Sequence, residues 1–434
     1  MNIIVIAHNQ YDLLIKWMES AEKSGISMDN AVFVDNYSDD GLSEALKETA
    51  LNYIVCDEKK EAYSVICNTV IREFNFTGKV YVTSPEYMLD DKLLSLLEQE
   101  MDEAGDMAAI SPAIYNSPEL YYNAVNGGEA DADSFVSFNC TPMCVMYNMA
   151  VFDELDGFDE KLFLPDSSIK DYIFRALLLG HHCAESNRAM VLSYGADRMH
   201  QPLEALKNDR TVLKRKWNMN YFNTIPNGNL IVMMNGDRNA EINVLEIGCD
   251  CGANLLEIKR YYKNANLYGV EINEDAARLA SQLINVKNGN IEEQSIDFGV
   301  RFDYIIFGDV LEHLHAPDKA VRYCKKMLKN GGRIIASIPN LGCYEVIREL
   351  LKGNFQYSDT GLLDRTHIHF FAFNEILRLF INEGYSVENV RTIGTELTDA
   401  DRKFIDNLMK ISPETQEHML TTYQYVVSAV YNGE

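Results

Sequence analysis

The sequence predicts an α/β protein with two domains, each a mainly parallel sheet with flanking helices. Short apolar runs alternate with amphipathic helical patterns in both halves, as expected for parallel strands joined by helices. The 434 residues exceed the usual size of one hydrophobic core. A turn-rich stretch at 226–240 separates the two alternating segments. We therefore expect one domain at 1–225, a linker at 226–240 and a second domain at 241–434.

The composition narrows the classes of partner and compartment. The net charge of −26 disfavours nucleic acid as a partner, because nucleic-acid binding needs a basic surface. The first residues, MNIIVIAHNQ, lack the basic start and the long apolar run of a signal peptide. No apolar run approaches the roughly 18 residues needed to span a bilayer. Nine cysteines in this context indicate free thiols in a reducing compartment. We expect a cytoplasmic protein.

The N-terminal half is predicted to begin with a strand and to alternate from there. Strands are expected at 2–7, 31–35, 52–56 and 79–83, and helices from about residue 10, at 42–50 and at about 61–73. The stretch NYSDDG after the second strand has the composition of a turn. This order predicts parallel strand–helix–strand units.

Five segments of this half carry a resemblance to a known enzyme family. They are VIAHNQYDLL, FVDNYSDDG, ICNTVI, VTSPEYML and LDGFDEKLF, in this order. Together they resemble the family-2 glycosyltransferases of the GT-A fold. The resemblance implies that the first strand and the DN-x-S-x-DG turn hold the uracil and ribose of a nucleotide sugar. The nucleotide-sugar residues that it implies are Asn9, Asp35, Asn36 and Asn68.

The same resemblance implies a divalent metal ion and a catalytic base. Glu86 occupies the position of the acidic residue that binds Mg²⁺ or Mn²⁺ in the family, and such hard ions prefer oxygen ligands. The family's acidic pair, which supplies the general base, aligns here with Ser168 and Ile169, and isoleucine cannot take a proton. Asp166 is the nearby carboxylate that could substitute as the base. The alternative is a domain that binds a nucleotide, a glycan or a partner without catalysis.

The C-terminal half alternates in the same way. Strands are expected at 244–247, 267–271, 302–310 and 330–340, and helices after Gly252, at 274–284, up to Lys329 and within 396–418. The final run LTTYQYVVSAVY alternates enough to predict an antiparallel strand at the edge of the sheet. Ligands of open parallel sheets bind at the carboxyl ends of the strands, so the functional residues are expected there.

A glycine-bearing turn follows the first strand of this half. The run VLEIGCDCG ends a strand in a tight turn that contains Gly248 and Gly252. Glu271 closes the next apolar run 19 positions after Gly252, a spacing that suits a carboxylate accepting both hydroxyl hydrogens of a ribose. The dinucleotide pattern G-x-G-x-x-G fails, because its second and third positions are Asp250 and Ala253. The turn suits a nucleoside without phosphates better than a dinucleotide.

The segments that follow the turn carry a second resemblance. LEIGCDCG, GVEIN, GNIEE, FDYIIFGDVLEHL and KNGGRIIASIPN occur in order over about 150 residues. They resemble the class I S-adenosylmethionine-dependent methyltransferases, which have a Rossmann-like fold. The resemblance implies S-adenosylmethionine as the cofactor, with the first motif at its methionine end, the acidic residue on its ribose and the GNI segment against its adenine. The cofactor-binding residues that it implies are Glu246, Gly248, Gly252, Glu271, Asn290, Ile291 and Asp309.

The segment GLLDRTHIHFFAFNEI is the candidate acceptor region. A similar D-x-T-H-x-x-F-F segment occurs in the branch of the family associated with cell-surface polysaccharide gene clusters. A sugar hydroxyl needs a base to remove its proton, and histidine can serve near neutral pH. His367 is the candidate base, and Asp364 and His313 are further candidate catalytic residues. Two alternatives stay open: Asp364, Thr366 and His367 form a hydrogen-bonded turn that shapes the pocket, and His313 caps the next helix.

The two resemblances predict one polypeptide with two enzyme modules. We expect methyl transfer from S-adenosylmethionine to a hydroxyl of a sugar or surface glycan, coupled to glycosyl transfer from a nucleotide sugar, because tethering raises the local concentration. The expected partners are a nucleotide sugar and a glycan acceptor, with peripheral membrane association through a lipid-linked substrate. The competing hypotheses are a methyltransferase with an inactive glycosyltransferase-like binding module and a small-molecule methyltransferase.

Overall fold

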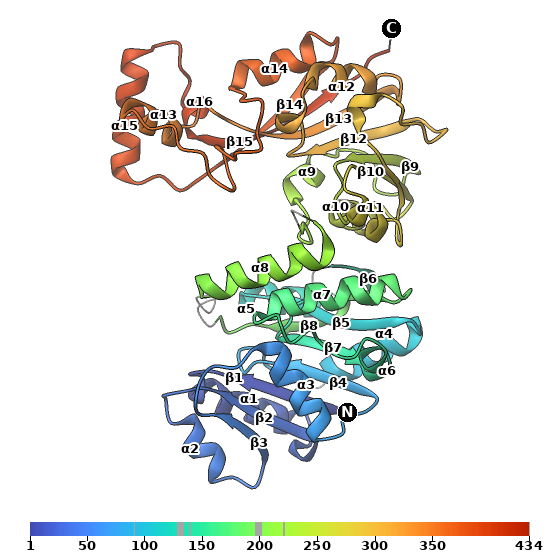
Figure 1. The fold of residues 1–434 in the computed structure, drawn as a ribbon, viewed down its shortest axis with the longest axis vertical. Coiled ribbons are helices and arrows are strands. Elements are labelled where there is room, and N and C mark those ends of the chain that lie inside the picture. Colours follow the sequence, from blue (N-terminus) through green and yellow to red (C-terminus); the bar gives the residue numbers. More distant parts are fainter. Residues whose placement is uncertain (91, 128–133, 139, 196–201, 220–221, 434) are drawn as a thin grey trace. The chain divides into compact units, whose positions relative to one another are not determined.

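The chain forms two compact α/β units, Met1–Thr224 and Ile225–Glu434. The computed structural model describes residues 1–90, 92–127, 134–138, 140–195, 202–219 and 222–433. Figure 1 colours the first unit from blue to green and the second from green to red. Each unit has its own sheet, and both sheets are mixed. The predicted α/β class is confirmed, and the antiparallel strands are an addition to the mainly parallel sheets that were expected.

The N-terminal unit contains an eight-stranded sheet in the order β3-β2-β1-β4-β7-β5-β8-β6. Its strands are β1 (Asn2–Ala7), β2 (Ala31–Asn36), β3 (Asn52–Cys56), β4 (Lys79–Thr83), β5 (Met107–Tyr115), β6 (Phe135–Val136), β7 (Cys144–Asn148) and β8 (His182–Leu192). Its helices are α1 (Tyr11–Lys23), α2 (Leu42–Lys47), α3 (Tyr63–Glu73), α4 (Leu93–Ala104), α5 (Pro118–Gly127), α6 (Met149–Glu154), α7 (Pro165–Leu178) and α8 (Leu203–Trp217). Strands β1 to β4 pair in parallel, and β7 runs antiparallel to β4 and β5.

The core of this unit lies around its first strands. All six residues of β2 are buried, and so are the last five of β1, as expected for parallel strands covered on both faces. Trp17 of α1 is fully buried and packs edge-on against Phe33, with ring centroids 6.0 Å apart. The four predicted strands are present. The helix expected at 42–50 ends at Lys47.

The C-terminal unit contains a seven-stranded sheet in the order β11-β10-β9-β12-β13-β15-β14. Its strands are β9 (Ile242–Ile247), β10 (Ala265–Glu271), β11 (Asn285–Asn288), β12 (Phe302–Gly308), β13 (Leu328–Pro339), β14 (Ser386–Gly394) and β15 (Thr422–Val430). Its helices are α9 (Gly228–Val232), α10 (Ala253–Tyr261), α11 (Glu274–Ala280), α12 (Pro317–Cys324), α13 (Tyr344–Leu351), α14 (Phe373–Ile381), α15 (Asp399–Ile411) and α16 (Glu417–Thr421). The helix that was expected to reach Lys329 ends at Cys324, because β13 already begins at Leu328.

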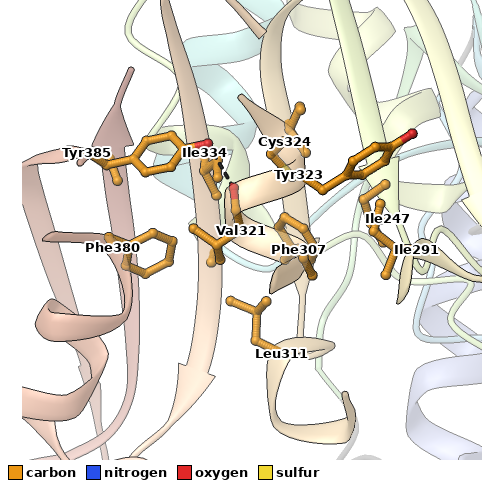
Figure 2. Close-up of a cluster of buried hydrophobic side chains, with 14 of the residues drawn as sticks. Ile247, Ile291, Phe307, Leu311, Val321, Tyr323, Cys324, Ile334, Phe380 and Tyr385 are labelled. Carbon is orange, nitrogen blue, oxygen red and sulfur yellow. Dashed lines mark hydrogen bonds between the residues drawn. The ribbon is translucent and has the colours of Figure 1, made fainter. Parts of the chain in front are cut away.

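Alternate residues of the central strands enter two different cores. Leu245, Ile305 and Ile334 belong to the cluster beneath α12 and α14, whereas Val244 and Ile306 belong to the cluster beneath α9 and α10. This period of two is the signature of strands with both faces covered. Figure 2 shows the first cluster, in which the Tyr385 hydroxyl also donates a hydrogen bond of 3.0 Å to the carbonyl of Val321.

The final strand is not at the edge of the sheet, so this prediction was wrong. β15 is antiparallel, as expected, but it lies between β13 and β14 and pairs with both. β14 takes the edge, and its residues are mostly exposed, whereas the last six residues of β15 are all buried. The sequence of β14, SVENVRTIG, is mostly polar and does not alternate regularly, so it was not recognised as a strand.

The described residues form no helix with the length and apolar character required to cross a bilayer. All nine cysteines lie in the described part of the chain and are free thiols, as predicted.

Candidate functional site

The order of the strands locates a crevice in the C-terminal unit. Numbered within the unit, the strand order is 3-2-1-4-5-7-6. Successive strands are added toward one edge of the sheet from β9 to β11 and on the other side of β9 from β12 onward, so the strand order reverses between β9 and β12. Ligands of open α/β sheets bind outside the carboxyl ends of the strands at such a reversal. The residues that follow these two strands are Gly248 and Asp309, both of which the sequence analysis selected. The topology therefore brings the predicted cofactor residues to one end of one sheet.

The turn after β9 depends on both of its glycines. Gly248 has φ +73° and Gly252 has φ +96°, in the left-handed region that favours glycine. A Cβ on Gly248 would lie 2.5 Å from Val310 Cγ2, and one on Gly252 would lie 2.6 Å from Ile284 Cδ1. Asp250, where the resemblance to the class I methyltransferases implies a middle glycine, adopts φ +48°, which aspartate tolerates better than most residues. The substituted turn thus keeps its left-handed geometry.

Glu271 ends β10 with its carboxylate turned toward this loop. Oε2 accepts a hydrogen bond of 2.9 Å from the backbone N–H of Asp250, and Oε1 accepts one of 2.7 Å from the backbone N–H of Asn273. Each carboxylate oxygen can accept more than one hydrogen bond, so both oxygens retain capacity for a ligand hydroxyl. The backbone fixes the direction of the carboxylate, and a ribose diol fits that arrangement.

Glu246 is a buried carboxyl at the end of β9. Its Oε1 accepts a hydrogen bond of 2.6 Å from Asn254 Nδ2, and Asn254 Oδ1 accepts one of 2.6 Å from the backbone N–H of Asn227. Its Oε2 has no hydrogen-bond partner among the described residues. Burial raises the pKa of Glu246 to about 8, and Asp250 and Glu271 add to the shift. Glu246 Oε2 could therefore accept a hydrogen bond from a cationic group of a ligand.

The GNI segment is anchored by the Asn290 side chain and the buried Ile291. The Asn290 side chain accepts a hydrogen bond of 3.0 Å from the backbone N–H of Glu292, which starts the short 3-10 turn at Ile291–Glu293. Ile291 is only 3% exposed and lies in the core beside Ile247 and Phe307 (Figure 2). Its side chain therefore serves the core first, and the backbone of this segment remains for contact with a base.

Two acidic groups follow β12. Asp309 has φ +56°, and Gln424 of β15 donates a hydrogen bond to its Oδ1. Desolvation raises the pKa of Asp309 to about 6. Glu312 is 1% exposed, and its Oε2 has no hydrogen-bond partner among the described residues. Burial, followed by the charges of Asp309 and Asp364, raises the pKa of Glu312 well above its usual value. Asp309 can therefore accept or release a proton near neutral pH, and burial favours the protonated form of Glu312.

The candidate acceptor segment is fastened to this end of β12. The backbone N–H groups of Ile368 and His369 both donate hydrogen bonds of 3.0 Å to the carbonyl of Glu312. His313 lies with Nδ1 3.2 Å from the carbonyl of Thr366. α12 begins after Ala316 and has no side-chain cap, so the alternative that His313 caps this helix was wrong. His313 ties the acceptor segment down instead.

Asp364 forms the hydrogen-bonded turn, and His367 keeps the features of a base. Asp364 Oδ1 accepts hydrogen bonds from the backbone N–H and the hydroxyl of Thr366, at 2.8 and 2.7 Å, which is the local turn foreseen as an alternative. His367 Nδ1 lies 3.3 Å from the carbonyl of Leu362, and a carbonyl can only accept, so this nitrogen carries the proton. Burial, with the nearby His313, lowers the pKa of His367. The ring is therefore neutral at pH 7, with a lone pair on Nε2.

The same groups could hold a divalent metal ion. Glu312, His313 and His367 each offer one ligand atom, a carboxylate oxygen or an imidazole nitrogen, and these three atoms all lie within 4.8 Å of one another. Both histidines direct Nδ1 at a backbone carbonyl, which is the usual outer contact of a metal-bound imidazole. Two imidazoles and a carboxylate form a donor set that suits transition metals. The sequence pointed to the two histidines but not to Glu312, although Glu312 lies beside His313 in the LEHLH segment.

The N-terminal unit also places its reversal of strand order beside predicted residues. Its sheet reverses between β1 and β4. Asp35, at the end of β2, is 1% exposed; its Oδ1 accepts a hydrogen bond of 3.0 Å from the Ser38 N–H, and its Oδ2 has no hydrogen-bond partner among the described residues. Asn9 and Asn36 have internal partners: Asn9 Oδ1 accepts from the Asp39 N–H, and Asn36 bonds both backbone groups of Glu61. Of these three, Asp35 keeps a free acceptor.

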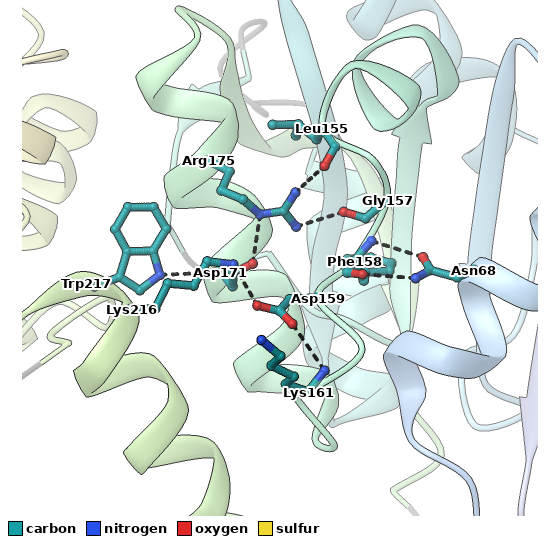
Figure 3. Close-up of polar contacts among 10 residues, drawn as sticks. All are labelled: Asn68, Leu155, Gly157, Phe158, Asp159, Lys161, Asp171, Arg175, Lys216 and Trp217. Atoms are coloured by element: carbon teal, nitrogen blue, oxygen red, sulfur yellow. Dashed lines mark hydrogen bonds and ion pairs between the residues drawn. The ribbon is translucent and has the colours of Figure 1, made fainter.

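Asn68 clamps the loop that carries the GFDE motif. Its amide donates to the carbonyl of Phe158 at 2.9 Å and accepts from the N–H of Phe158 at 3.0 Å (Figure 3). Arg175 bonds the carbonyls of Leu155 and Gly157 and pairs with the fully buried Asp171 at 2.8 Å. A cavity of about 600 Å³ opens beside this loop. The amide of Asn68 is engaged within the protein, which is a structural use of this residue.

The carboxylates of Glu86 and Asp166 both act electrostatically on Tyr87. Burial, then the charge of Glu86 and more weakly that of Asp166, raises the pKa of Tyr87. Asp166 is exposed in the first turn of α7. Ser168 and Ile169, at the positions of the family's acidic pair, are 0% and 3% exposed, so they face the interior. Asp166 is the exposed carboxylate nearest in sequence to these two positions.

Comparison with protein-family models concerns the C-terminal unit. Residues 228–390 match the family model described as a methyltransferase domain. A ubiquinone biosynthesis O-methyltransferase of Dechloromonas aromatica is 25% identical over 132 residues, which cover 26% of this chain and 56% of that protein. The protein of the same name from Aromatoleum aromaticum is 27% identical over 141 residues, covering 28% and 59%. The chain thus spans little more than half the length of these relatives.

Solved structures with a similar fold include an S-adenosylmethionine-dependent methyltransferase from Archaeoglobus fulgidus. It is 18% identical, with a TM-score of 0.33, and the alignment covers 51% of this chain and 94% of that one. Another from Mesorhizobium loti is 14% identical, with a TM-score of 0.33 and coverages of 47% and 96%.

Proposed function

We propose that this protein, whose C-terminal unit contains a class I S-adenosylmethionine-dependent methyltransferase domain, transfers a methyl group to a hydroxyl of a sugar or surface glycan. The cofactor supplies the reactive methyl group on a sulfonium, so the protein has to bind, align and deprotonate. The observation that carries the proposal is the carboxylate of Glu271. Backbone N–H groups hold both of its oxygens beside the glycine turn, where they can accept the two hydroxyls of a ribose.

Glu246, near the end of β9, supports the binding of the same cofactor. S-adenosylmethionine carries an ammonium at its methionine end, and Glu246 Oε2 is a buried acceptor without a hydrogen-bond partner among the described residues. The resemblance assigns this end of the cofactor to the first motif. An ammonium at this place would favour the ionised form of Glu246 and lower its raised pKa.

We assign His367 as the base that takes the proton of the acceptor hydroxyl. Its Nδ1 is committed to the carbonyl of Leu362, and its lowered pKa leaves Nε2 free of a proton at pH 7. Asp309, with a pKa of about 6, is a second group that can take this proton. If a divalent ion binds Glu312, His313 and His367, it would supply the same activation by polarising the hydroxyl.

For the N-terminal unit we propose the binding of a nucleotide sugar and glycosyl transfer to the glycan. The buried Asp35, whose Oδ2 has no hydrogen-bond partner among the described residues, supports this proposal. Glu86 would hold Mg²⁺ or Mn²⁺, which neutralises the diphosphate. The buried Ser168 and Ile169 favour the alternative, a binding module that recruits the glycan without catalysis.

Release of S-adenosylhomocysteine tests the proposed methyl transfer. The full chain is incubated with S-adenosylmethionine and either methyl pyranosides or catechol, with and without EDTA. Release that depends on a pyranoside supports the proposal, and loss of that release in EDTA adds the metal ion to it. Release with catechol alone favours the small-molecule alternative. Failure of the protein to bind S-adenosylhomocysteine would remove the methyltransferase function.

A further inference from the structure

An exposed aromatic pair lies in the segment that leads into the acceptor region. Every residue from 351 to 360 is exposed. Phe355 is 41% exposed and Tyr357 is 51% exposed, although large aromatic side chains normally bury most of their surface. Two such rings side by side indicate a contact surface for a ligand, because exposed apolar clusters are costly in water.

The two rings belong to a row that reaches the candidate base. The centroids of Phe355 and Tyr357 are 5.5 Å apart, and they lie 5.9 and 6.4 Å from that of Phe370. Phe370 in turn lies 6.3 Å from His367, and His367 lies 4.8 Å from His313. Ring contacts therefore run without a break from the carboxyl end of β12 to the surface. A molecule bound across Phe355, Tyr357 and Phe370 would contact the ring that neighbours His367.

The backbone holds this segment in place. The Ser358 N–H donates a hydrogen bond of 2.9 Å to the carbonyl of Leu363, and the Arg365 N–H donates one of 3.1 Å to the carbonyl of Ser358. At the other end, the Asn354 N–H donates one of 2.9 Å to the carbonyl of Glu349 in α13. The rings are thus presented by a segment that is tied to the acceptor loop on one side and to a helix on the other.

The residues around the rings distinguish between a sugar and a lipid chain. Polar residues interleave with the rings in Asn354–Thr360, NFQYSDT. Arg365 and Asp359, paired at 2.8 Å, are both largely exposed beside them. A sugar ring has C–H faces that pack on aromatic rings and hydroxyls that need polar partners. A lipid chain would gain nothing from the charged pair and would have to desolvate it.

We propose that Phe355, Tyr357 and Phe370 form a subsite that holds a pyranose ring of the acceptor through its C–H face, next to His367. The subsite rests on the proposed methyl transfer and gives it a substrate class. The stacked ring fixes the acceptor, so that a hydroxyl of this ring or its neighbour comes within reach of the base.

Saturation-transfer NMR on the full chain with bound S-adenosylhomocysteine tests the subsite. The probes are methyl α-D-glucopyranoside, methyl α-D-mannopyranoside and methyl α-L-rhamnopyranoside, with geraniol as the apolar comparison. The double variant Phe355→Ala, Tyr357→Ala should weaken pyranoside binding about tenfold, which is the effect of losing two aromatic contacts. Tyr261→Ala is the matched control, because Tyr261 is a 40% exposed aromatic residue on α10 of the same unit.

Each outcome decides the proposal. Saturation transfer to a pyranoside that the double variant loses and the control keeps supports it. Transfer to geraniol alone, or to no probe, overturns the subsite while bound S-adenosylhomocysteine still supports the methyltransferase. Transfer that persists in the double variant also overturns it. Wild-type protein that fails to bind S-adenosylhomocysteine overturns the proposed function and the subsite with it.

Discussion

Glu246 is the residue at which burial and ionisation oppose each other most clearly. Its pKa rises to about 8 in the folded chain, against an ordinary value of 4.5. Between these two values the folded protein holds a proton that the unfolded chain releases. Raising the pH through this window therefore lowers the free energy of unfolding, and the full penalty is present above pH 8.

Glu246→Gln should remove this penalty, because the amide is neutral and can still accept from Asn254. The variant should gain stability over the wild type as the pH rises from 5 to 8, by several kcal/mol at most, since one pKa unit corresponds to about 1.4 kcal/mol. Urea unfolding at pH 5 and pH 8 gives the difference in free energy of unfolding between the variant and the wild type. The transition to follow is the one that S-adenosylhomocysteine shifts. A difference that does not vary with pH would refute the buried neutral carboxyl.

His367→Ala should lower the turnover number about 100-fold or more and leave the affinity for S-adenosylhomocysteine unchanged. The imidazole acts on the acceptor and makes no predicted contact with the cofactor. His315→Ala is the control, because His315 is an exposed histidine on the neighbouring turn. Equal turnover numbers for the wild type and His367→Ala would eliminate the base role.

The sequence identified site residues whose partners lie nearby in the chain. Gly248, Gly252 and Glu271 belong to one strand–turn–helix–strand unit, so their spacing alone predicted their meeting. Gln424 was missed because it meets Asp309 across 115 positions of sequence, through the pairing of β15. Asn36 and Asn68 have partners in distant loops, and nothing in the local sequence indicates that their amides are already engaged.

At the scale of elements, β15 holds the end of the sheet together. It pairs with β13 along seven residues and with β14 along eight, and its side chains Tyr425, Val427 and Ala429 enter the core. An interior strand cannot be removed without exposing two others, whereas an edge strand exposes one. The alternating pattern in the sequence predicted this strand correctly, but its neighbours depend on long-range pairing that the pattern does not encode.

Truncation after Thr421 should therefore abolish cooperative folding of the C-terminal unit. The expected sign is loss of the melting transition that S-adenosylhomocysteine shifts, with a second transition left for the N-terminal unit. Removal of residues 432–434 is the control, since they follow β15. A truncated chain that still binds S-adenosylhomocysteine would contradict the interior position of β15.

At the scale of the whole molecule, the chain joins two α/β units, each with a reversal of strand order and an acidic residue close to it. Alternating strand and helix patterns sufficed to predict this architecture. They could not predict β5 to β8, where the antiparallel β7 interrupts the alternation. Whether the N-terminal unit transfers a sugar depends on side chains rather than on this architecture.

UDP with Mn²⁺ should raise the melting temperature of the N-terminal unit, because a ligand that binds only the native state stabilises it. Asp35→Asn should abolish most of this rise, since Asp35 Oδ2 is the open acceptor at the proposed site. The response to S-adenosylhomocysteine should be the same in both proteins. Absence of a shift with any nucleoside diphosphate would remove the glycosyltransferase proposal.

Calorimetric titration with S-adenosylhomocysteine tests the central claim most directly, because the methyltransferase function depends on a ribose held by Glu271. The wild type should bind one equivalent, and Glu271→Ala should bind at least about tenfold more weakly, the loss expected for charge-assisted hydrogen bonds. Glu274→Ala, which removes an exposed carboxylate at the start of α11, should bind like the wild type. Equal affinities for the wild type and Glu271→Ala, or no binding by the wild type, would contradict the account.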